Sequence, residues 1–162
     1  MEAPRRLTDA RRVRVELALN HYRVAAQEAA LASQRLGDIR VPSCARWSHI
    51  GATTGSPGNP TATRAVHALD VRRRHEVSAF LAEVVGAWLW SPDRHPDDRL
   101  LLALVHGMHR QERVSLLDAA SALRIPCRSA SEVRAVERHY EVLLLSVGDA
   151  LDAGARTWRW SA

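Results

Sequence analysis

The residue types with the clearest potential for chemistry lie between positions 128 and 138, where arginines and serines alternate with apolar side chains. Guanidinium groups bind phosphates in bidentate fashion and form hydrogen bonds with guanine edges. Serine hydroxyls can form hydrogen bonds with phosphates or with base edges. At 100° per residue, three of these side chains share one side of a helix, roughly opposite its apolar residues. The candidate DNA-contacting residues are therefore Arg128, Ser129, Ser131, Arg134 and Arg138.

Two helix-start signals surround this stretch. Ser115 lies three residues before Asp118, and Ser129 lies three residues before Glu132. In a capping box, the hydroxyl accepts a hydrogen bond from the third amide, and the acid reaches back to the amide of the capping residue. The two boxes predict helices at about 116–124 and 130–152.

The segment between these helices should form a turn, because Pro126 disfavours helical geometry at Ile125. Ala119 and Ala120 are small enough to let the second helix cross closely. This pattern is typical of a helix-turn-helix that enters the major groove, but a bend between two packed helices would produce it as well. Arg124 occupies a position before the turn where glycine is often found.

The bulk composition favours an all-α protein with a basic surface. Of 162 residues, 46% are hydrophobic, and alanine, leucine, valine and arginine dominate. The net charge is +5, and all 23 basic residues are arginines. We expect long N-terminal helices followed by the C-terminal helix-turn-helix. The basic surface suits nucleic acid, although a solvated basic surface without a partner is an equal alternative.

The N-terminal part reads as one helix over residues 8–36, which Thr8 or Asp9 can cap and Gly37 can end. Apolar and small residues follow a 4-3 spacing that makes a seam. This seam is either the core face of a bundle helix or a coiled-coil contact with a second copy. Its partner-binding candidates are Val15, Leu19 and Tyr22.

The rest of the chain divides at its proline-rich and glycine-rich segments. Pro60 should open a central helix that ends near Trp90, with Val77 on its apolar side and Arg72, Arg73 and Arg74 solvated or facing an anion. A further helix should begin near Asp97 and extend to about residue 110. The expected organisation is an N-terminal helix (1–36), a flexible linker (37–60), a central helix and break (61–96), a helix-turn-helix domain (97–152) and a tryptophan-containing tail (153–162).

The C-terminal tail carries Trp158 and Trp160 on either side of Arg159. These tryptophans can fold back on the core. Alternatively they can anchor a binding partner, because tryptophan and arginine are frequent in binding hot spots. Both interpretations are open from the sequence.

Metal, cofactor and catalytic sites are not indicated. His106 and His109 are three residues apart on an expected helix, but no third ligand and no paired cysteines accompany them. The glycine-rich segment lacks the following lysine of a phosphate loop, and no nucleophile motif occurs. We therefore expect no metal, no cofactor and no enzyme. Because neither a membrane span nor a secretory signal is recognisable, the expected location is the cytoplasm.

The order of parts resembles the phage late-gene transcription regulators of the ArpU/RinA/Xpf-like type, whose C-terminal part is similar to the fourth region of sigma factors. Four stretches carry the resemblance: VELALNHYRVAAQEAAL, GATTGSPGNPTATRAVHAL, DDRLLLALVHGMHRQERVSLLDAASALRI and IPCRSASEVRAVERHYEVLLLSVGDAL. Together they cover about residues 12–152. His106 departs from the family pattern, which tends to have an aromatic residue there, and Pro126 stands where a serine often begins the turn.

The resemblance implies binding to double-stranded promoter DNA and activation of late phage genes together with the RNA polymerase of the bacterial host. It places the same five residues, from Arg128 to Arg138, against DNA. Two alternatives remain. One is a DNA-packaging protein like a small terminase subunit, or a helical adaptor, that assembles as a dimer or ring through the N-terminal seam. The other is a protein-interaction module that contacts the polymerase without touching DNA.

Overall fold

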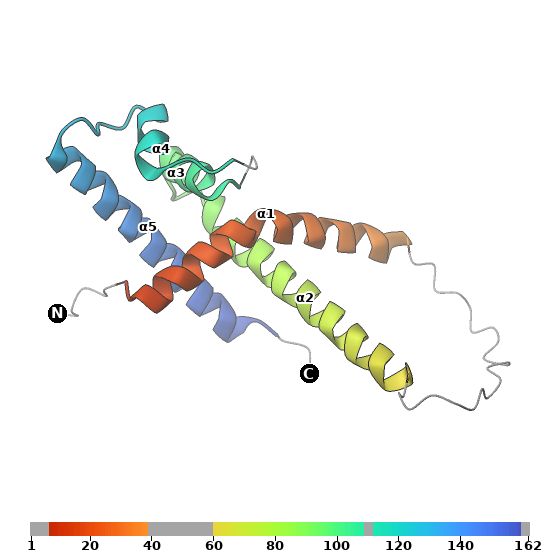
Figure 1. The fold of residues 1–162 in the computed structure, drawn as a ribbon. Helices are drawn as coiled ribbons and strands as arrows, with labels where there is room; N and C mark the ends of the chain where they lie inside the picture. Colours follow the sequence, from red (N-terminus) through yellow and green to blue (C-terminus); the bar gives the residue numbers. More distant parts are fainter. Residues whose placement is uncertain (1–6, 39–59, 109–111, 160–162) are drawn as a thin grey trace.

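A computed structural model describes residues 7–38, 60–108 and 112–159, and for residues 32–38 and 60–69 the description concerns the backbone. Within these ranges the chain forms five helices and no strand (Figure 1). They are α1 (Asp9–Asp38), α2 (Pro60–Leu89), α3 (Pro96–His106), α4 (Leu116–Ala122) and α5 (Ala130–Thr157). The all-α prediction is confirmed. None of the described helices is both long and apolar enough to cross a membrane.

Helices α1 and α2 begin where the sequence indicates. The Oγ1 of Thr8 accepts a hydrogen bond from the amide of Arg11 at 3.4 Å, and Pro60 occupies the first position of α2. The predicted end of α1 is wrong, because Gly37 lies inside the helix, which continues to Asp38. Glycine can adopt either hand of backbone, so its presence alone does not end a helix.

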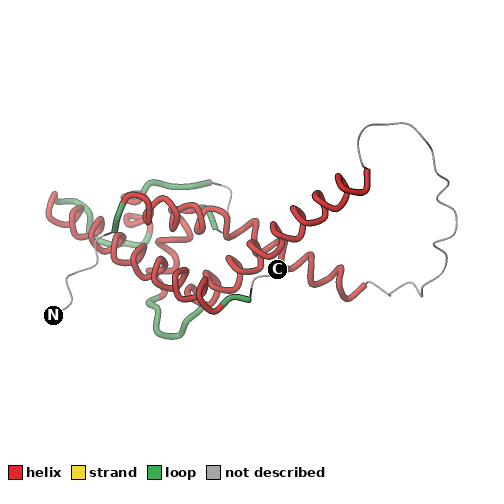
Figure 2. The backbone as a smooth tube through the Cα atoms, turned by 90° about the horizontal axis from the view of Figure 1, so that it is seen from below, coloured by secondary structure: helices red, strands yellow, loops and turns green. Residues whose placement is uncertain are grey.

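The two long helices pack extensively on each other, and α5 packs on both of them. Figures 1 and 2 show the end of α1 and the start of α2 projecting beyond the other three helices. Glycines allow the close contacts with α5. A Cβ added at Gly148 would lie 3.2 Å from a methyl group of Val15, and one added at Gly154 would lie 2.6 Å from a methyl group of Val84. Side chains of α1 and α2 therefore pack directly against the backbone of α5 at these two glycines.

Helix α3 is a short, well-defined element. The ring of His95 accepts a hydrogen bond from the amide of Asp97, and Pro96 takes the first helical position. The predicted extension to residue 110 is wrong, because Gly107 adopts a left-handed conformation, with φ of 62°, and ends the helix at His106. Its amide donates to the carbonyl of Ala103, which completes the cap.

A single hydrophobic core draws on all five helices. Val15 and Leu19 are fully buried in it, so they do not form a seam that a second copy could reach, and the bundle-core interpretation of α1 is confirmed. The predicted end of the last helix at about residue 152 is wrong, because α5 continues to Thr157. Since α3, α4 and α5 share their core with α1 and α2, the described helices form one packed unit.

Two apolar residues of the long helices are exposed, and one of them, Val77, was expected on the buried side of its helix. Val77 is 47% exposed on α2, and Val142 is 59% exposed on α5. Both lie on helices whose apolar residues extend almost around the axis, so periodicity alone does not select the buried side. Phe80, Val85 and Trp88 are buried as expected, and the indole of Trp88 donates to the hydroxyl of Ser146 at 3.0 Å.

A buried polar group connects three of the helices. The Nδ1 of His106 lies 2.9 Å from the side-chain oxygen of Asn20, and its Nε2 lies 2.8 Å from the hydroxyl of Tyr140. Burial lowers the pKa of His106 to about 4, with opposing effects from Glu16, which raises it, and Arg113, which lowers it further. The same burial raises the pKa of Tyr140 to about 12. A neutral imidazole thus joins α3 to α1 and to the apolar side of α5.

Candidate nucleic-acid interface

The start of α5 is fixed by a complete capping box. The Oγ of Ser129 accepts from the amide of Glu132 at 3.3 Å, and the carboxylate of Glu132 accepts from the amide of Ser129 at 2.8 Å. The same carboxylate also accepts from the amide of Arg128 at 2.8 Å. These backbone hydrogen bonds, together with one from the Ser129 side chain, hold the pKa of Glu132 below its usual value. The predicted capping box is confirmed, and it fixes Ser129 as the N-cap of α5.

The start of α4 is capped more simply. The Oγ of Ser115 accepts from the amide of Asp118 at 3.1 Å and donates to the carboxylate of Asp118 at 2.6 Å. The carboxylate therefore meets the hydroxyl of Ser115, where a full capping box would have it meet the backbone amide. Helix α4 still begins one residue after the serine, as predicted, but it ends at Ala122 rather than at residue 124.

The connection between α4 and α5 turns at Arg124. This residue has a φ of 59°, and the amide of Ile125 donates to the carbonyl of Ala120 at 2.9 Å. An arginine thus adopts the left-handed conformation for which glycine is favoured. The seven residues from Leu123 to Ser129 form the whole connection. This exceeds the three or four residues that are typical of DNA-reading helix pairs, so the helix-turn-helix assignment stays a prediction.

The five predicted contact residues share one exposed region. Arg128, Ser129, Ser131, Arg134 and Arg138 are all exposed, while Val136, Tyr140, Leu143 and Leu144 are buried on the other side of α5. The hydroxyl of Ser129 is used in the cap and lies 3.0 Å from that of Ser131. Ser129 therefore caps the start of the helix, whereas the side chains of the three arginines are exposed to solvent. We call Arg128, Arg134 and Arg138 the arginine face.

Two exposed carboxylates, Glu137 and Glu141, lie beside the arginine face and were not among the predicted site residues. Position 137 is three residues from Arg134, and position 141 is three residues from Arg138, so the helical spacing makes each carboxylate a neighbour of an arginine. This spacing is present in the sequence, but a prediction based only on basic residues does not include the two acids. These acids reduce the net positive charge of the surface around the arginine face.

The arginines of α1 are placed very differently. The guanidinium of Arg11 contacts the carboxylates of Asp149 at 2.6 Å and Asp152 at 3.1 Å, and Arg14 contacts Asp152 at 2.6 Å. These hydrogen bonds and the nearby carboxylate charges raise the pKa of Arg11 further. The C-terminal half of α5 thus neutralises arginines of α1. The arginine face makes no ion pair with any residue that the structure describes, so its charge is available to an anion.

The predicted partner-binding residues fall into different environments. The half-buried ring of Trp158 meets Phe80 edge-on, with centroids 5.4 Å apart and an interplanar angle of 80°. Trp158 thus folds back on the core, which was one of the two interpretations of the tail. Trp160 lies outside the described residues. Tyr22 is half-buried, and its hydroxyl would lie 3.4 Å from a Cβ added at Gly86.

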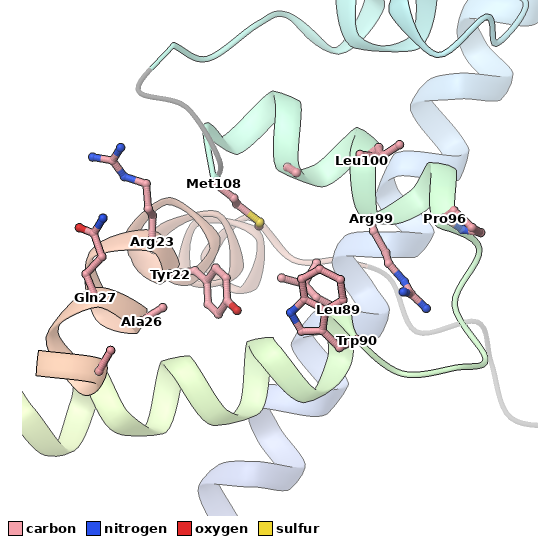
Figure 3. A pocket seen from close by; sticks show the side chains of 12 residues that line it. Tyr22, Arg23, Ala26, Gln27, Leu89, Trp90, Pro96, Arg99, Leu100 and Met108 are labelled. Carbon is pink, nitrogen blue, oxygen red and sulfur yellow. The ribbon is translucent and has the colours of Figure 1, made fainter. Parts of the chain in front are cut away.

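Tyr22 also lines a hollow of about 560 Å³ between α1, the end of α2 and α3 (Figure 3). Figure 3 shows its ring, Leu89 and Trp90 around the hollow, with Met108 on the side of α3. The guanidinium of Arg99 donates to the carbonyls of Ser91 at 2.5 Å and Arg94 at 3.1 Å. The residues that line the hollow include no carboxylate, thiol or imidazole, so it offers an apolar surface rather than groups for acid–base chemistry.

Within the described ranges, no three histidine, cysteine or acidic side chains are close enough to hold a metal ion. His109, one of the two histidines considered as ligands, lies outside those ranges. His106 is committed to Asn20 and Tyr140 through both ring nitrogens.

Comparison of the chain with models of protein families, with curated proteins and with solved structures finds no match in any of the three.

Proposed function

We propose that this protein binds double-stranded DNA sequence-specifically and regulates transcription, with the N-terminal half of α5 as its reading surface. The observation that carries the proposal is the arginine face. Arg128, Arg134 and Arg138 are exposed and without a described ion-pair partner, while the opposite side of the same helix is packed in the core. A rigid helix with a basic front suits the major groove, which is about 12 Å wide in B-form DNA.

Each arginine has a different part in this mechanism. Arg128 directly precedes the helix, so its guanidinium would contact a phosphate beside the helix start. Arg134 and Arg138 are four residues apart, which is about 6 Å along the axis, so they would reach neighbouring base edges. Ser131 lies between the helix start and these arginines and can bond to a phosphate or a base. Phosphate contacts would supply affinity, and Arg134 and Arg138 would supply specificity.

The biological setting rests on the resemblance to phage late-gene regulators. By that resemblance the protein activates late genes of a phage or prophage at a promoter, together with host RNA polymerase in the bacterial cytoplasm. The runner-up is a DNA-packaging or adaptor protein. The hollow with exposed Trp90 and Leu100 favours this runner-up, because a contiguous apolar surface is typical of a protein contact.

Selection of binding sequences from a random double-stranded library, followed by footprinting on phage and neighbouring host DNA, tests the proposal. A short enriched sequence that is protected upstream of a gene supports the regulator, and protection near a packaging site supports the alternative. The affinity should fall steeply with salt, because each neutralised phosphate releases counterions. If no sequence is enriched and no DNA is protected at low salt, the proposed function is wrong.

A further inference from the structure

A second exposed surface lies between α1, α2 and the C-terminal half of α5. It consists of two hollows, of about 270 Å³ and about 560 Å³, that adjoin because His21 and Leu81 line both. The smaller hollow includes Leu17 and the C-terminal half of α5, and the larger includes Val24 and Val77. We call this surface the α1–α2 face. Figure 1 shows α1, α2 and the end of α5 meeting in this part of the fold.

The α1–α2 face exposes large aliphatic side chains. Leu17 is 52% exposed, Val24 45% and Val77 47%. Leu17 and Val24 are seven residues apart and so lie on nearly the same side of α1, whereas the predicted seam residues Val15 and Leu19 are buried. Soluble monomers rarely leave such side chains clustered around a hollow, and a cluster of this kind marks a contact surface.

The charges around the face identify the type of occupant. Arg73 and Arg74 lie on the α2 side, and Glu28 lies on the α1 side, where its carboxylate accepts from the hydroxyl of Ser78 at 2.5 Å. The ion pair of Arg14 and Asp152 lies at the other end. A nucleic acid or an acidic peptide would bind best to a surface that carries only positive charge. A two-fold contact brings a patch against itself, so a charged patch is electrostatically complementary to itself only when it carries both signs.

We propose that two copies of this chain associate through the α1–α2 face as a two-fold dimer. The apolar centre would be formed by Leu17, Val24 and Val77 of each copy, and the arginines at the α2 side of one copy would approach the carboxylate of Glu28 on the other. Each half of such a contact removes exposed aliphatic surface from water, which is the main source of free energy for association.

One consequence depends on the proposed DNA function. Leu151 and Ala155 of α5 line the smaller hollow, while Arg134 and Arg138 lie nearer the other end of the same helix. Because α5 is one continuous helix, a dimer through the α1–α2 face fixes the separation of the two arginine faces. The DNA target should then contain two inverted half-sites at a constant spacing.

Light scattering coupled to size exclusion, from about 1 to 100 μM chain, measures the association directly. We expect a dimer for the wild-type chain, and a dissociation constant at least about tenfold higher for Val24→Glu and Val77→Glu. Because both side chains are nearly half exposed, the variants should fold, which circular dichroism and thermal unfolding can verify. Leu100→Glu is the matched control, since Leu100 is 45% exposed but lines the hollow beside α3. It should leave the dimer unchanged.

A charge-reversal series separates a specific contact from general loss of solubility. Arg73→Glu with Arg74→Glu should weaken the dimer, and the addition of Glu28→Arg should restore it. A chain that is monomeric at every concentration overturns the proposal, as does a dimer that Leu100→Glu dissociates and Val24→Glu does not. A dimer that binds no DNA would leave this inference standing and overturn the proposed function, while a DNA-binding monomer would do the reverse.

Discussion

The imidazole of His106 and the ring of Tyr140 are nearly parallel, with an interplanar angle of 16° and centroids 6.2 Å apart. The Nε2 of His106 is 2.8 Å from the tyrosine hydroxyl, so a hydrogen bond joins α3 to the apolar side of α5. Because this histidine is buried in its neutral form, we expect the packing of α5 to depend on pH.

Acid should therefore destabilise the protein. Burial lowers the pKa of His106 to about 4, from 6.5 in an unfolded chain. Between these pH values the unfolded state binds more protons than the folded state. The contribution of His106 to the free energy of unfolding is therefore fully present above pH 6.5 and decreases as the pH falls toward 4. The loss is about 3 kcal/mol at most, since one pKa unit corresponds to about 1.4 kcal/mol. Urea unfolding at pH 7.5, 5.5 and 4.5 measures it.

His106→Gln is the control for this pH effect, because glutamine can bond to Asn20 and Tyr140 but does not titrate in this range. The variant should be less stable at pH 7.5 and should lose less stability than the wild type between pH 7.5 and 4.5. An unchanged pH dependence in His106→Gln would show that other groups cause the acid destabilisation.

The left-handed conformation of Arg124 predicts an unusual stabilising substitution. A residue with a Cβ pays about 1 kcal/mol or more in this region, whereas glycine adopts it freely. Arg124→Gly should therefore be at least as stable as the wild type, and more stable than Arg124→Ala by about 1 kcal/mol. Thermal and urea unfolding of the two variants measure the difference. Equal stability of the glycine and alanine variants would contradict a left-handed residue 124.

The close approach of α5 to α2 predicts opposite effects for the same substitution at two glycines. At Gly154 an added Cβ would lie 2.6 Å from Val84, so Gly154→Ala should destabilise by about 1–3 kcal/mol through overpacking. At Gly86 the nearest atom is the Tyr22 hydroxyl at 3.4 Å, an ordinary contact, so Gly86→Ala should stabilise α2 by about 0.5–1 kcal/mol. If both variants unfold at the same denaturant concentration, the packing of α5 on α2 is different from that described here.

The acidic neighbours of the arginine face predict a gain in DNA affinity. Glu137 lies three residues from Arg134, and its negative charge would repel phosphates near the reading surface. Glu137→Gln should strengthen binding to DNA up to about fivefold, in line with the modest energies of exposed charge interactions. Fluorescence anisotropy with a labelled duplex measures the change. Glu83→Gln, an exposed acid on α2, is the control, and an equal gain for both variants would point to net charge alone.

The capping motifs allowed the helix starts to be predicted closely, because a serine and an acid at fixed spacing act locally. Helix ends were harder to predict. Gly37 continues α1, Gly107 ends α3, and Arg124 adopts the left-handed conformation without being a glycine, so the residue type alone does not predict where a helix ends. The exposed arginines of α5 followed from periodicity. The exposure of Val77 did not, because which of two apolar sides becomes buried depends on the neighbouring helices.

The spacing of Val15 and Leu19 correctly indicated a packing surface but could not show whether the other side was this chain or another copy. The structure assigns them to the core, and leaves Leu17 and Val24 exposed on the same helix. A repeat of apolar residues predicts that one side of a helix is buried. Which helix covers that side is known only from the three-dimensional structure.

The central claim is that Arg134 and Arg138 read DNA bases. The most direct test is the affinity of Arg134→Gln and Arg138→Gln for the selected duplex and for a scrambled one, with Arg156→Gln as the control. Arg156 is exposed in the last turn of the same helix, so its substitution removes equal charge far from the arginine face. We expect each of the first two variants to lose about 1–3 kcal/mol of binding to the selected duplex and much less to the scrambled one. Losses equal to those of Arg156→Gln on both duplexes would contradict the account.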